Sequence, residues 1–326
     1  MIYLDNGATT RPFPNKYRDN NYWLNSHSSY SNGDALLWNC RERIAKCIGG
    51  KPNEIFFTSG GCEGNTWCIN MLYSLKGEKV KVSPNEHKSI INNPRVRICS
   101  GDYDSCMLVN NEIGVRYDIH SLHKDMVQAL GKVRVKVGEY GELMGTGSGH
   151  KVHGEKGVGF VWIDESLHGY MSPLIYGGAQ EFGMRGGTTN LEAILHMTDC
   201  IEIMTSDEHL EKNDILWAEF MDELDRYNLK HKNKLILNAV PDICTFSLRN
   251  KDNINGEYIV NRLAEKEIYI STGSACSTGE PSYVLKNLGL TNDEANATIR
   301  VSLDGEENSK EDIEVFFREV GEVLNE

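Results

Sequence analysis

Hydrophobic positions along the chain alternate between a spacing typical of helices and a spacing typical of buried strands. Apolar residues recur at helical spacing within 34–48, and Gly49-Gly50 ends that segment. Ile55–Thr58 and Val158–Ile163 are short apolar runs typical of buried strands, and Leu191–Met204 returns to helical spacing. Because helices and strands alternate, the pattern predicts an α/β domain with a largely parallel sheet.

The pattern changes after about Asp207, where the predicted helices become longer and more polar. A last helix is predicted to begin at Ser309-Lys310-Glu311-Asp312, which resembles a capping box. We therefore predict two domains. Residues 11–205 form the larger one, and residues 1–10 together with 206–326 form a smaller α+β domain.

Composition and charge exclude several classes of protein. The formal net charge of −13 is unfavourable for direct binding to nucleic acid. No apolar run approaches the roughly 20 residues of a membrane span, and the N-terminus lacks a signal peptide's features, so we expect a cytoplasmic protein. The nine cysteines include no Cys-x-x-Cys pair, so neither a disulfide framework nor a metal site is indicated. The acidic excess in 304–326 fits either a solvated helix face or a docking surface for a basic partner.

Four short motifs could carry chemistry, although each also has an ordinary structural interpretation. Lys151, in Ser148-Gly149-His150-Lys151, is either a loop lysine or a lysine that forms a Schiff base. The turn at Gly60-Gly61-Cys62-Glu63 begins a helix, where free amides can bind phosphate. Asp125 could hold a pyridine nitrogen in its protonated form, and His87 is either a surface histidine or part of the same site.

The order of the motifs is more informative than any one of them. The series runs through nearly the whole chain and consists of Tyr3–Thr10, Phe57–Glu63, Glu86-His87, Asn110–Val115, Asp125–Lys132, Ser148–Lys151 with Gly154–Gly157, Gly177–Glu181 through Arg185–Thr188, Ser271–Gly279 and Ile299–Leu303. In this order the motifs resemble those of the NifS/IscS-type cysteine desulfurases of the class V aminotransferase group. The resemblance implies the fold type I architecture of enzymes that depend on pyridoxal 5'-phosphate (PLP).

The resemblance also implies an activity and a role for individual residues. The chain would be a homodimer that converts L-cysteine to L-alanine, holds the sulfur as a persulfide on Cys276, and passes it to a sulfur-acceptor protein. Lys151 would hold PLP covalently and remove the substrate's Cα proton, and His87 would stack on the ring. The remaining implied roles are Asp125 at the pyridine nitrogen; Gln128 and Asn111 at the ring oxygen; Gly61, Cys62, Ser148, His150 and a second subunit's Thr188 at the phosphate; and Arg300 with Asn25 at the substrate carboxylate.

Two departures from the family pattern bear most on the structure. Cys62 stands where the family usually has a hydroxyl residue at the phosphate. The stretches 88–109 and 115–124 are shorter than usual, although a parallel crossover normally needs about a dozen residues or more. Shortened crossovers would uncover an apolar sheet face, which either a partner or rearranged local elements must cover.

Two other functions stay open on the sequence alone. One is a PLP enzyme that resembles a selenocysteine lyase. The other is a catalytically silent scaffold of the same fold, which the shortened domain suggests and the intact Lys151, Asp125 and Cys276 oppose. The acceptor is equally open among iron–sulfur cluster assembly, tRNA thiolation and DNA sulfur modification.

Overall fold

The computed structural model describes residues 1–18, 25, 32–231, 234–236, 242–247, 255–272 and 281–325, which form two compact units. The larger unit comprises Thr10–Val109 and Tyr117–Ser206, and the smaller unit comprises Met1–Thr9, Asn110–Arg116 and Asp207–Glu326. The segment Asn110–Arg116 therefore packs with the smaller unit, whereas the sequence had placed it in the larger domain. The physical reason is its Ile113, which is buried against Val284 and Leu285 of the smaller unit.

The larger unit is built on a mostly parallel sheet, as the sequence predicted. Single-residue parallel bridges from Ser105 to His123 and Val82 join its two parts. Among the described strands of this sheet, only β7 runs antiparallel to its neighbours. The strands are, in spatial order, β2 (Ile55–Thr58), β7 (Gly159–Ile163), β6 (Met144–Ser148) and β5 (His123–Asp125), followed beyond Ser105 by β3 (Val80–Val82) and β4 (Val96–Ile98).

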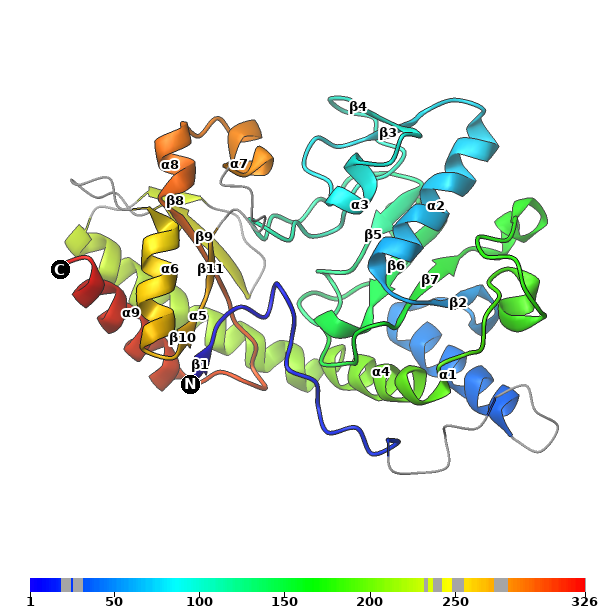
Figure 1. The fold of residues 1–326 in the computed structure, drawn as a ribbon, viewed down its shortest axis with the longest axis horizontal. Helices are drawn as coiled ribbons and strands as arrows, with labels where there is room; N and C mark the ends of the chain where they lie inside the picture. The colour runs from blue at the N-terminus through cyan, green and yellow to red at the C-terminus, as the bar shows by residue number, and fades with distance from the viewer. Residues whose placement is uncertain are drawn as a thin grey trace. The chain divides into compact units, whose positions relative to one another are not determined.

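Helix α2 (Gly61–Lys76) packs closely on this sheet because residue 64 has no side chain. A Cβ on Gly64 would lie 2.6 Å from Thr146 Cγ2 and 2.9 Å from Val161 Cγ1. The apolar side of α2, with Trp67 at its centre, is buried against the sheet. The helices α1 (Gly33–Ile48) and α4 (Leu191–Met204) lie side by side in the same unit (Figure 1). Short 3-10 helices cover Pro52–Glu54, Gly149–Lys151, Glu165–Tyr170 and Gln180–Gly183.

The shortened connections leave part of the sheet face opposite α2 without a covering helix, and the side chains on that part are polar. The chain between β3 and β4 contains only the four-residue helix α3 (Lys88–Ile91). On β3, Val80 and Val82 are buried in the core below α2, whereas Lys81 points to the other face and is partly exposed. Exposed Arg97 on β4 makes that region polar as well.

Local elements cover the remaining part of this face at β5. Lys124 is fully buried there, its Nζ donates to the Tyr117 carbonyl at 3.1 Å, and it lies 5.4 Å from the centre of the Tyr140 ring. Burial lowers the pKa of the Lys124 ammonium. Of the two explanations that the sequence left open, the described residues therefore support rearranged local elements.

The smaller unit pairs an antiparallel sheet with helices that bury a common aromatic core. Phe220, Phe246 and Phe316 lie at the centre of that core. The last helix begins at the predicted capping box, in which Ser309 Oγ accepts from Asp312 N at 3.3 Å. The strands of this sheet are, in spatial order, β11 (Ser271–Thr272), β12 (Thr298–Ser302), β9 (Ile243–Ser247) and β8 (Lys234–Ile236). A separate parallel pair consists of β1 (Ile2–Tyr3) and β10 (Ile268–Tyr269). The helices are α5 (Asp207–His231), α6 (Gly256–Glu265), α7 (Tyr283–Asn287), α8 (Asn292–Asn296) and α9 (Lys310–Val323).

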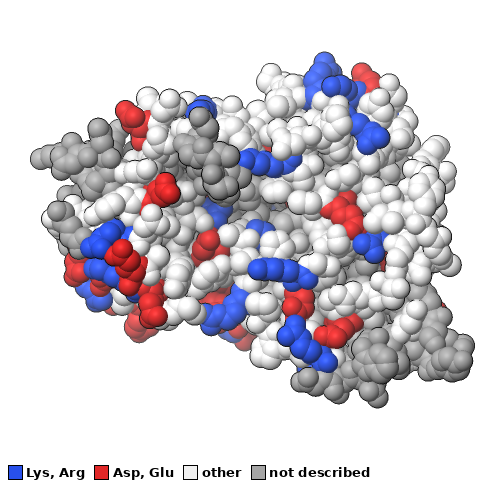
Figure 2. Space-filling view, viewed as in Figure 1, with Lys and Arg blue, Asp and Glu red and all other residues white. Residues whose placement is uncertain are grey.

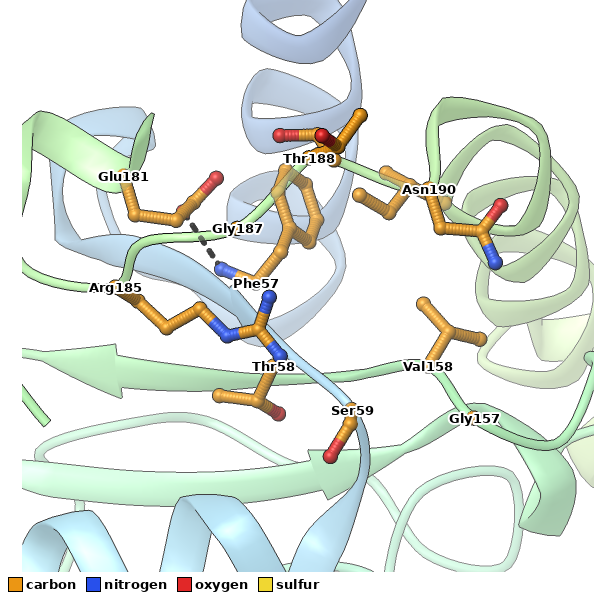
Figure 3. Close-up of a pocket in the computed structure, with 12 residues that line it drawn as sticks. Phe57, Thr58, Ser59, Gly157, Val158, Glu181, Arg185, Gly187, Thr188 and Asn190 are labelled. Atoms are coloured by element: carbon orange, nitrogen blue, oxygen red, sulfur yellow. Dashed lines mark hydrogen bonds between the residues drawn. The ribbon is translucent and has the colours of Figure 1, made fainter. Parts of the chain in front are cut away.

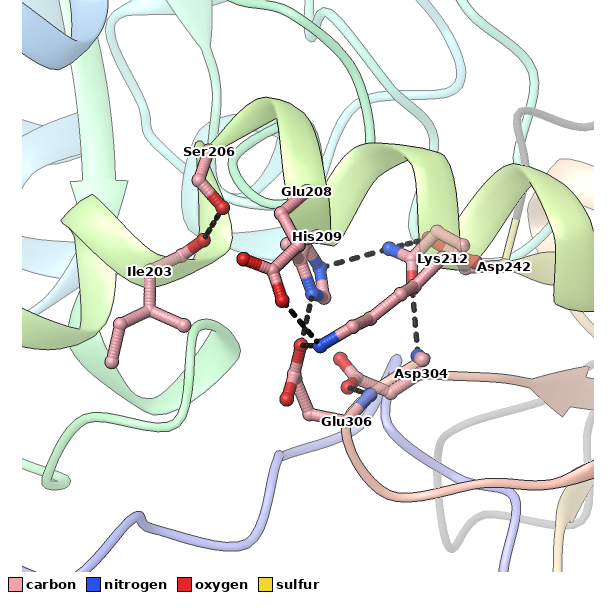
Figure 4. Close-up of polar contacts among 10 residues, drawn as sticks. Ile203, Ser206, Glu208, His209, Lys212, Asp242, Asp304 and Glu306 are labelled. Atoms are coloured by element: carbon pink, nitrogen blue, oxygen red, sulfur yellow. Dashed lines mark hydrogen bonds and ion pairs between the residues drawn. The ribbon is translucent and has the colours of Figure 1, made fainter.

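A buried polar cluster fastens the segment after β12 to helix α5 (Figure 4). His209 is 1% exposed, and its Nδ1 lies 3.4 Å from Glu306 Oε1. Asn213 accepts from Gly305 N at 2.7 Å and donates to Asp242 Oδ2 at 2.9 Å. These bonds fix the backbone that continues from the β12 strand.

Charges on the C-terminal helix are partly neutralised within the smaller unit. Lys266 pairs with Glu319 at 2.7 Å and with Glu322 at 3.0 Å. Figure 2 shows acidic and basic side chains interspersed over the face in view. Such pairs are typical of a solvated helix face, the first of the two interpretations of the acidic stretch.

Two features are absent from the described residues. None of their helices is both long enough and apolar enough to cross a membrane. They also contain no group of three or more histidine, cysteine or acidic side chains that could hold a metal ion.

Candidate active site

The turn between β2 and α2 forms a corner in the larger unit that can hold an anion, and we call it the anion corner. Gly60 has a φ of 146°, a conformation that favours glycine, and the first helical bond of α2 runs from Gly64 N to Gly60 O at 3.1 Å. The amides at the start of the helix precede that bond, so they can bind an anion. A Cβ on Gly61 would lie 2.9 Å from Val127 Cγ2 and 3.7 Å from Ser148 Cβ, so the corner faces both segments. Cys62 follows it and is exposed.

Asp125 ends strand β5 and is 5% exposed. Its Oδ2 accepts from Asn65 Nδ2 at 2.6 Å, and its Oδ1 accepts from Val127 N at 3.0 Å. Two donors on one buried carboxyl hold it in a fixed orientation. Asp125 can therefore pair with a cationic nitrogen.

His87 caps the N-terminus of α3 and lies close enough to Asp125 and Lys151 to respond to their charges. Burial is the largest influence and lowers the pKa of the His87 ring. The Asp125 carboxylate opposes this change, whereas the ammonium groups of Lys151 and Lys88 reinforce it. The imidazole is thus neutral near pH 7, so that it can accept or donate a proton.

Three candidate residues lie at the end of strand β6 or just after it. Ser148 ends the strand and is 3% exposed, and Lys151 follows in the 3-10 helix Gly149–Lys151. Gly149 is confined there, since a Cβ would lie 2.9 Å from Val158 Cγ1 and 3.1 Å from a backbone carbonyl. Burial, with the nearby Lys151 ammonium, lowers the pKa of His150 to about 4. His150 is therefore a neutral hydrogen-bonding group at physiological pH.

The residues of the larger unit fit PLP. The anion corner and the buried Ser148 supply an anion site. Asp125 supplies a buried carboxylate that accepts from two donors, and Lys151 supplies an amine whose charge lowers the pKa of the His87 ring. Gln128, 4% exposed, lies in the turn that follows Asp125. A phosphate, a pyridinium and an aldehyde each have a chemically matched group in this set.

Arg300 lies in the smaller unit, on β12, and is already well connected there. The side chain is 2% exposed, and Nη2 donates to Asp5 Oδ1 at 2.7 Å and to Ser271 Oγ at 3.1 Å. Nη1 donates to the backbone oxygen of Asn111 at 2.8 Å. Among the described residues, the buried Nε has no hydrogen-bond partner. The guanidinium is therefore held rigidly, while one of its donors is unused within this part of the chain.

The sequence-predicted residues outside these groups are placed as follows. Thr188 is exposed and lines a cavity of about 170 Å³ together with Ser59, Arg185 and Asn190 (Figure 3). Arg185 is committed to Glu63, to which its Nε donates at 2.9 Å. Asn25 is exposed. Cys276 lies outside the described residues.

Asn65 was not among the residues predicted from the sequence, although it is 1% exposed and donates to Asp125. A signal was available, because Asn65 precedes Cys68, Ile69 and Leu72 on the buried stripe of α2. A polar residue on a buried apolar stripe needs a hydrogen-bond partner, so its position indicates a candidate functional residue.

Comparisons with known proteins identify the family to which the chain belongs. The aminotransferase class V family model matches residues 2–100 and 105–316. The cysteine desulfurase IscS of Dictyoglomus turgidum is 32% identical, over 96% of this chain and 91% of the relative. A mitochondrial cysteine desulfurase of Drosophila melanogaster is 28% identical, over 93% of this chain and 76% of the relative. The X-ray structure of a NifS-like protein from Rickettsia africae superposes with a TM-score of 0.84 at 25% identity, over 100% of each chain.

The alignment with the Dictyoglomus protein spans 367 positions, more than the 326 residues of this chain, so the relative carries residues that this chain lacks. The larger unit nevertheless has a mostly parallel sheet. The chain belongs to the class V aminotransferase family and is a shortened member of its NifS/IscS-type cysteine desulfurase group, with the PLP-dependent fold type I.

Proposed function

We propose that the chain is a PLP-dependent cysteine desulfurase that forms L-alanine and holds the sulfur on Cys276. The observation that carries the proposal is the arrangement in the larger unit, where an anion corner, Asp125, His87 and Lys151 provide groups matched to PLP. The relatives named as cysteine desulfurases support the choice of substrate.

PLP, when bound, supplies an electron sink that allows a proton to leave the substrate's Cα and the Cβ–S bond to break. Lys151 would bind the cofactor and move the Cα proton. Asp125, fixed by Asn65 and the Val127 amide, would keep the proton on the pyridine nitrogen. His87 would stack on the ring, and Gln128 and Asn111 would contact its oxygen. The anion corner, Ser148 and His150 would hold the phosphate.

Arg300 binds the substrate carboxylate, helped by Asn25, in a pairing for which guanidinium geometry is well suited. Asp5 and Ser271 keep the guanidinium in place. The buried Nε of Arg300 supports this role, since none of the described residues accepts a hydrogen bond from it.

Sulfur transfer requires no outside oxidant. The Cys276 thiolate attacks the substrate sulfur, an S–S bond forms, and the Cβ–S bond breaks with its electron pair kept by the carbon fragment. That fragment takes up protons and leaves as alanine, and the enzyme keeps a persulfide. A thiol of a sulfur-acceptor protein then receives the terminal sulfur.

The proposal includes a cytoplasmic homodimer in which Thr188 of each subunit contacts the phosphate bound by the other. The exposure of Thr188, next to the cavity in Figure 3, supports this contact.

An absorption spectrum tests the proposal. Purified protein should show the visible band of bound PLP, and L-cysteine should change the band while alanine appears. Cys276→Ser should keep the band yet lose sulfide release. No band at all would favour the silent scaffold, and faster turnover of L-selenocysteine than of L-cysteine would favour the lyase.

A further inference from the structure

A chain of hydrogen bonds joins two residues of the candidate site through two side chains that have no assigned role. Asn65 Nδ2, on α2, donates to Asp125 Oδ2 at 2.6 Å and to Ser89 Oγ at 3.0 Å. Ser89 Oγ lies 2.8 Å from His87 Nδ1, and the Ser89 backbone N donates to the same nitrogen at 3.2 Å. The chain therefore runs from Asp125 through Asn65 and Ser89 to His87.

The direction of every proton in this chain follows from the carboxylate at its end. A carboxylate only accepts, so the group of Asn65 beside Asp125 is the amide NH₂. The second hydrogen of that NH₂ is directed at Ser89 Oγ, which accepts it. The Ser89 hydroxyl then has its own hydrogen to donate to His87 Nδ1.

His87 Nδ1 thus receives two donors, the hydroxyl and the backbone N–H of Ser89. A nitrogen that accepts carries no proton, so the proton of a neutral His87 ring must sit on Nε2. We propose that Asn65 and Ser89 are positioning residues that hold His87 as the tautomer protonated on Nε2. The proposal rests on the role assigned to His87 in the proposed function.

The consequence concerns the proton that His87 can exchange. With Nδ1 committed to Ser89, Nε2 is the one ring nitrogen that can give a proton to a reacting group. The charged or titratable groups that act on His87 are Asp125, Lys151, Lys88 and His150. A second proton on Nδ1 would face two donors, so the Ser89 contacts add to burial in favouring the neutral ring.

Selective ¹⁵N labelling of histidine in the PLP-loaded protein tests the proposal. A long-range ¹H–¹⁵N correlation spectrum distinguishes protonated from bare ring nitrogens, and the His87→Gln variant identifies the His87 signals. We expect a protonated Nε2 and a bare Nδ1. A protonated Nδ1 in the neutral ring would overturn the proposal. This readout is independent of desulfurase activity, so its failure and failure of the proposed function are distinguishable.

Variants of Ser89 separate positioning from a merely structural role. Ser89→Ala removes one donor to the neutral ring, so the ratio of protonated to neutral His87 at a given pH should rise about five-fold, the effect of one net hydrogen bond. Ser89→Thr keeps the hydroxyl and should restore the wild-type titration. Ser74→Ala is the matched control, because Ser74 is an exposed serine on α2 that donates to the backbone oxygen of Asn70. Titrations of His87 that are the same in Ser89→Ala and wild type would refute the proposal.

Discussion

Replacing Glu181 by alanine should destabilise the larger unit and weaken its anion corner. Glu181 is 5% exposed and accepts from Arg41 Nη2 at 2.8 Å through both oxygens and from Phe57 N at 2.8 Å. The Arg41 guanidinium lies between the rings of Phe57 and Phe182, at 4.6 and 4.9 Å from their centres. Glu181→Ala leaves the buried Arg41 guanidinium without its anion. It also removes the acceptor of the Phe57 backbone N–H on β2, one residue before Thr58.

The expected cost follows from the burial of both partners. Breaking a buried ion pair by removing one member costs about 3–5 kcal/mol, since an uncompensated charge remains. For a unit of this size, that loss lowers the melting temperature by roughly 6–20 °C. Removing both charges, in Arg41→Met with Glu181→Leu, should cost clearly less because no buried charge is left alone.

Thermal melting followed by circular dichroism measures these differences. The matched control is Glu165→Ala, because Glu165 pairs with Lys51 on the surface and its loss should cost less than about 1 kcal/mol. Fluorescence titration with PLP then reports the anion corner. A Glu181→Ala melting temperature equal to that of Glu165→Ala would refute the reasoning, as would a double variant less stable than Glu181→Ala.

Three other substitutions test the packing and the buried titratable groups. Gly64→Ala should lower stability by about 1–3 kcal/mol in urea denaturation because its Cβ would meet Thr146, whereas Gly169→Ala, with nothing within 4 Å, should not. Burial raises the pKa of Glu86 to about 8, above its unfolded value, so wild-type stability falls as pH rises towards 8; Glu86→Gln should flatten this loss between pH 5 and 8. Burial lowers the pKa of His123 to about 3. As the pH drops below about 6.5, the histidine of the unfolded chain takes up a proton and the free energy of unfolding should decrease. Melting curves of His123→Asn should show less of that decrease.

The element pattern of this chain could be predicted from the sequence because apolar spacing reflects burial directly. The segments 34–48, 55–58 and 191–204 are helix, strand and helix as expected, within a residue at each end. The Ser309 capping box also marks the start of α9. Each of these features depends on neighbours in sequence, which is why the pattern is sufficient.

The side-chain partnerships could not be predicted because they join distant parts of the chain. Asn65 meets Asp125 across 60 residues, and Arg300 meets Asp5 across 295. From its residue type, Lys124 would be expected on the surface, yet the Tyr117 carbonyl and the Tyr140 ring allow its complete burial. Only the tertiary structure supplies such partners, so the sequence left these residues without a role or with an incomplete one.

The site residues were available from the order of motifs rather than from local pattern. Lys151 and His87 each have an ordinary structural interpretation when taken alone. The structure adds a physical basis for considering them together, since the Lys151 ammonium acts on the buried His87 ring. It does not describe Cys276, so the role of that residue remains a prediction from the motif.

Locating the transferred sulfur tests the central claim most directly. Purified protein would be treated with a small excess of L-cysteine without any acceptor thiol, then alkylated, digested and analysed by peptide mass spectrometry, with alanine measured in parallel. The account predicts one additional sulfur on the peptide that contains Cys276, in an amount equal to the alanine formed, and neither product in Lys151→Ala. Alanine formed with the additional sulfur on another cysteine, or with none on the protein, would contradict it.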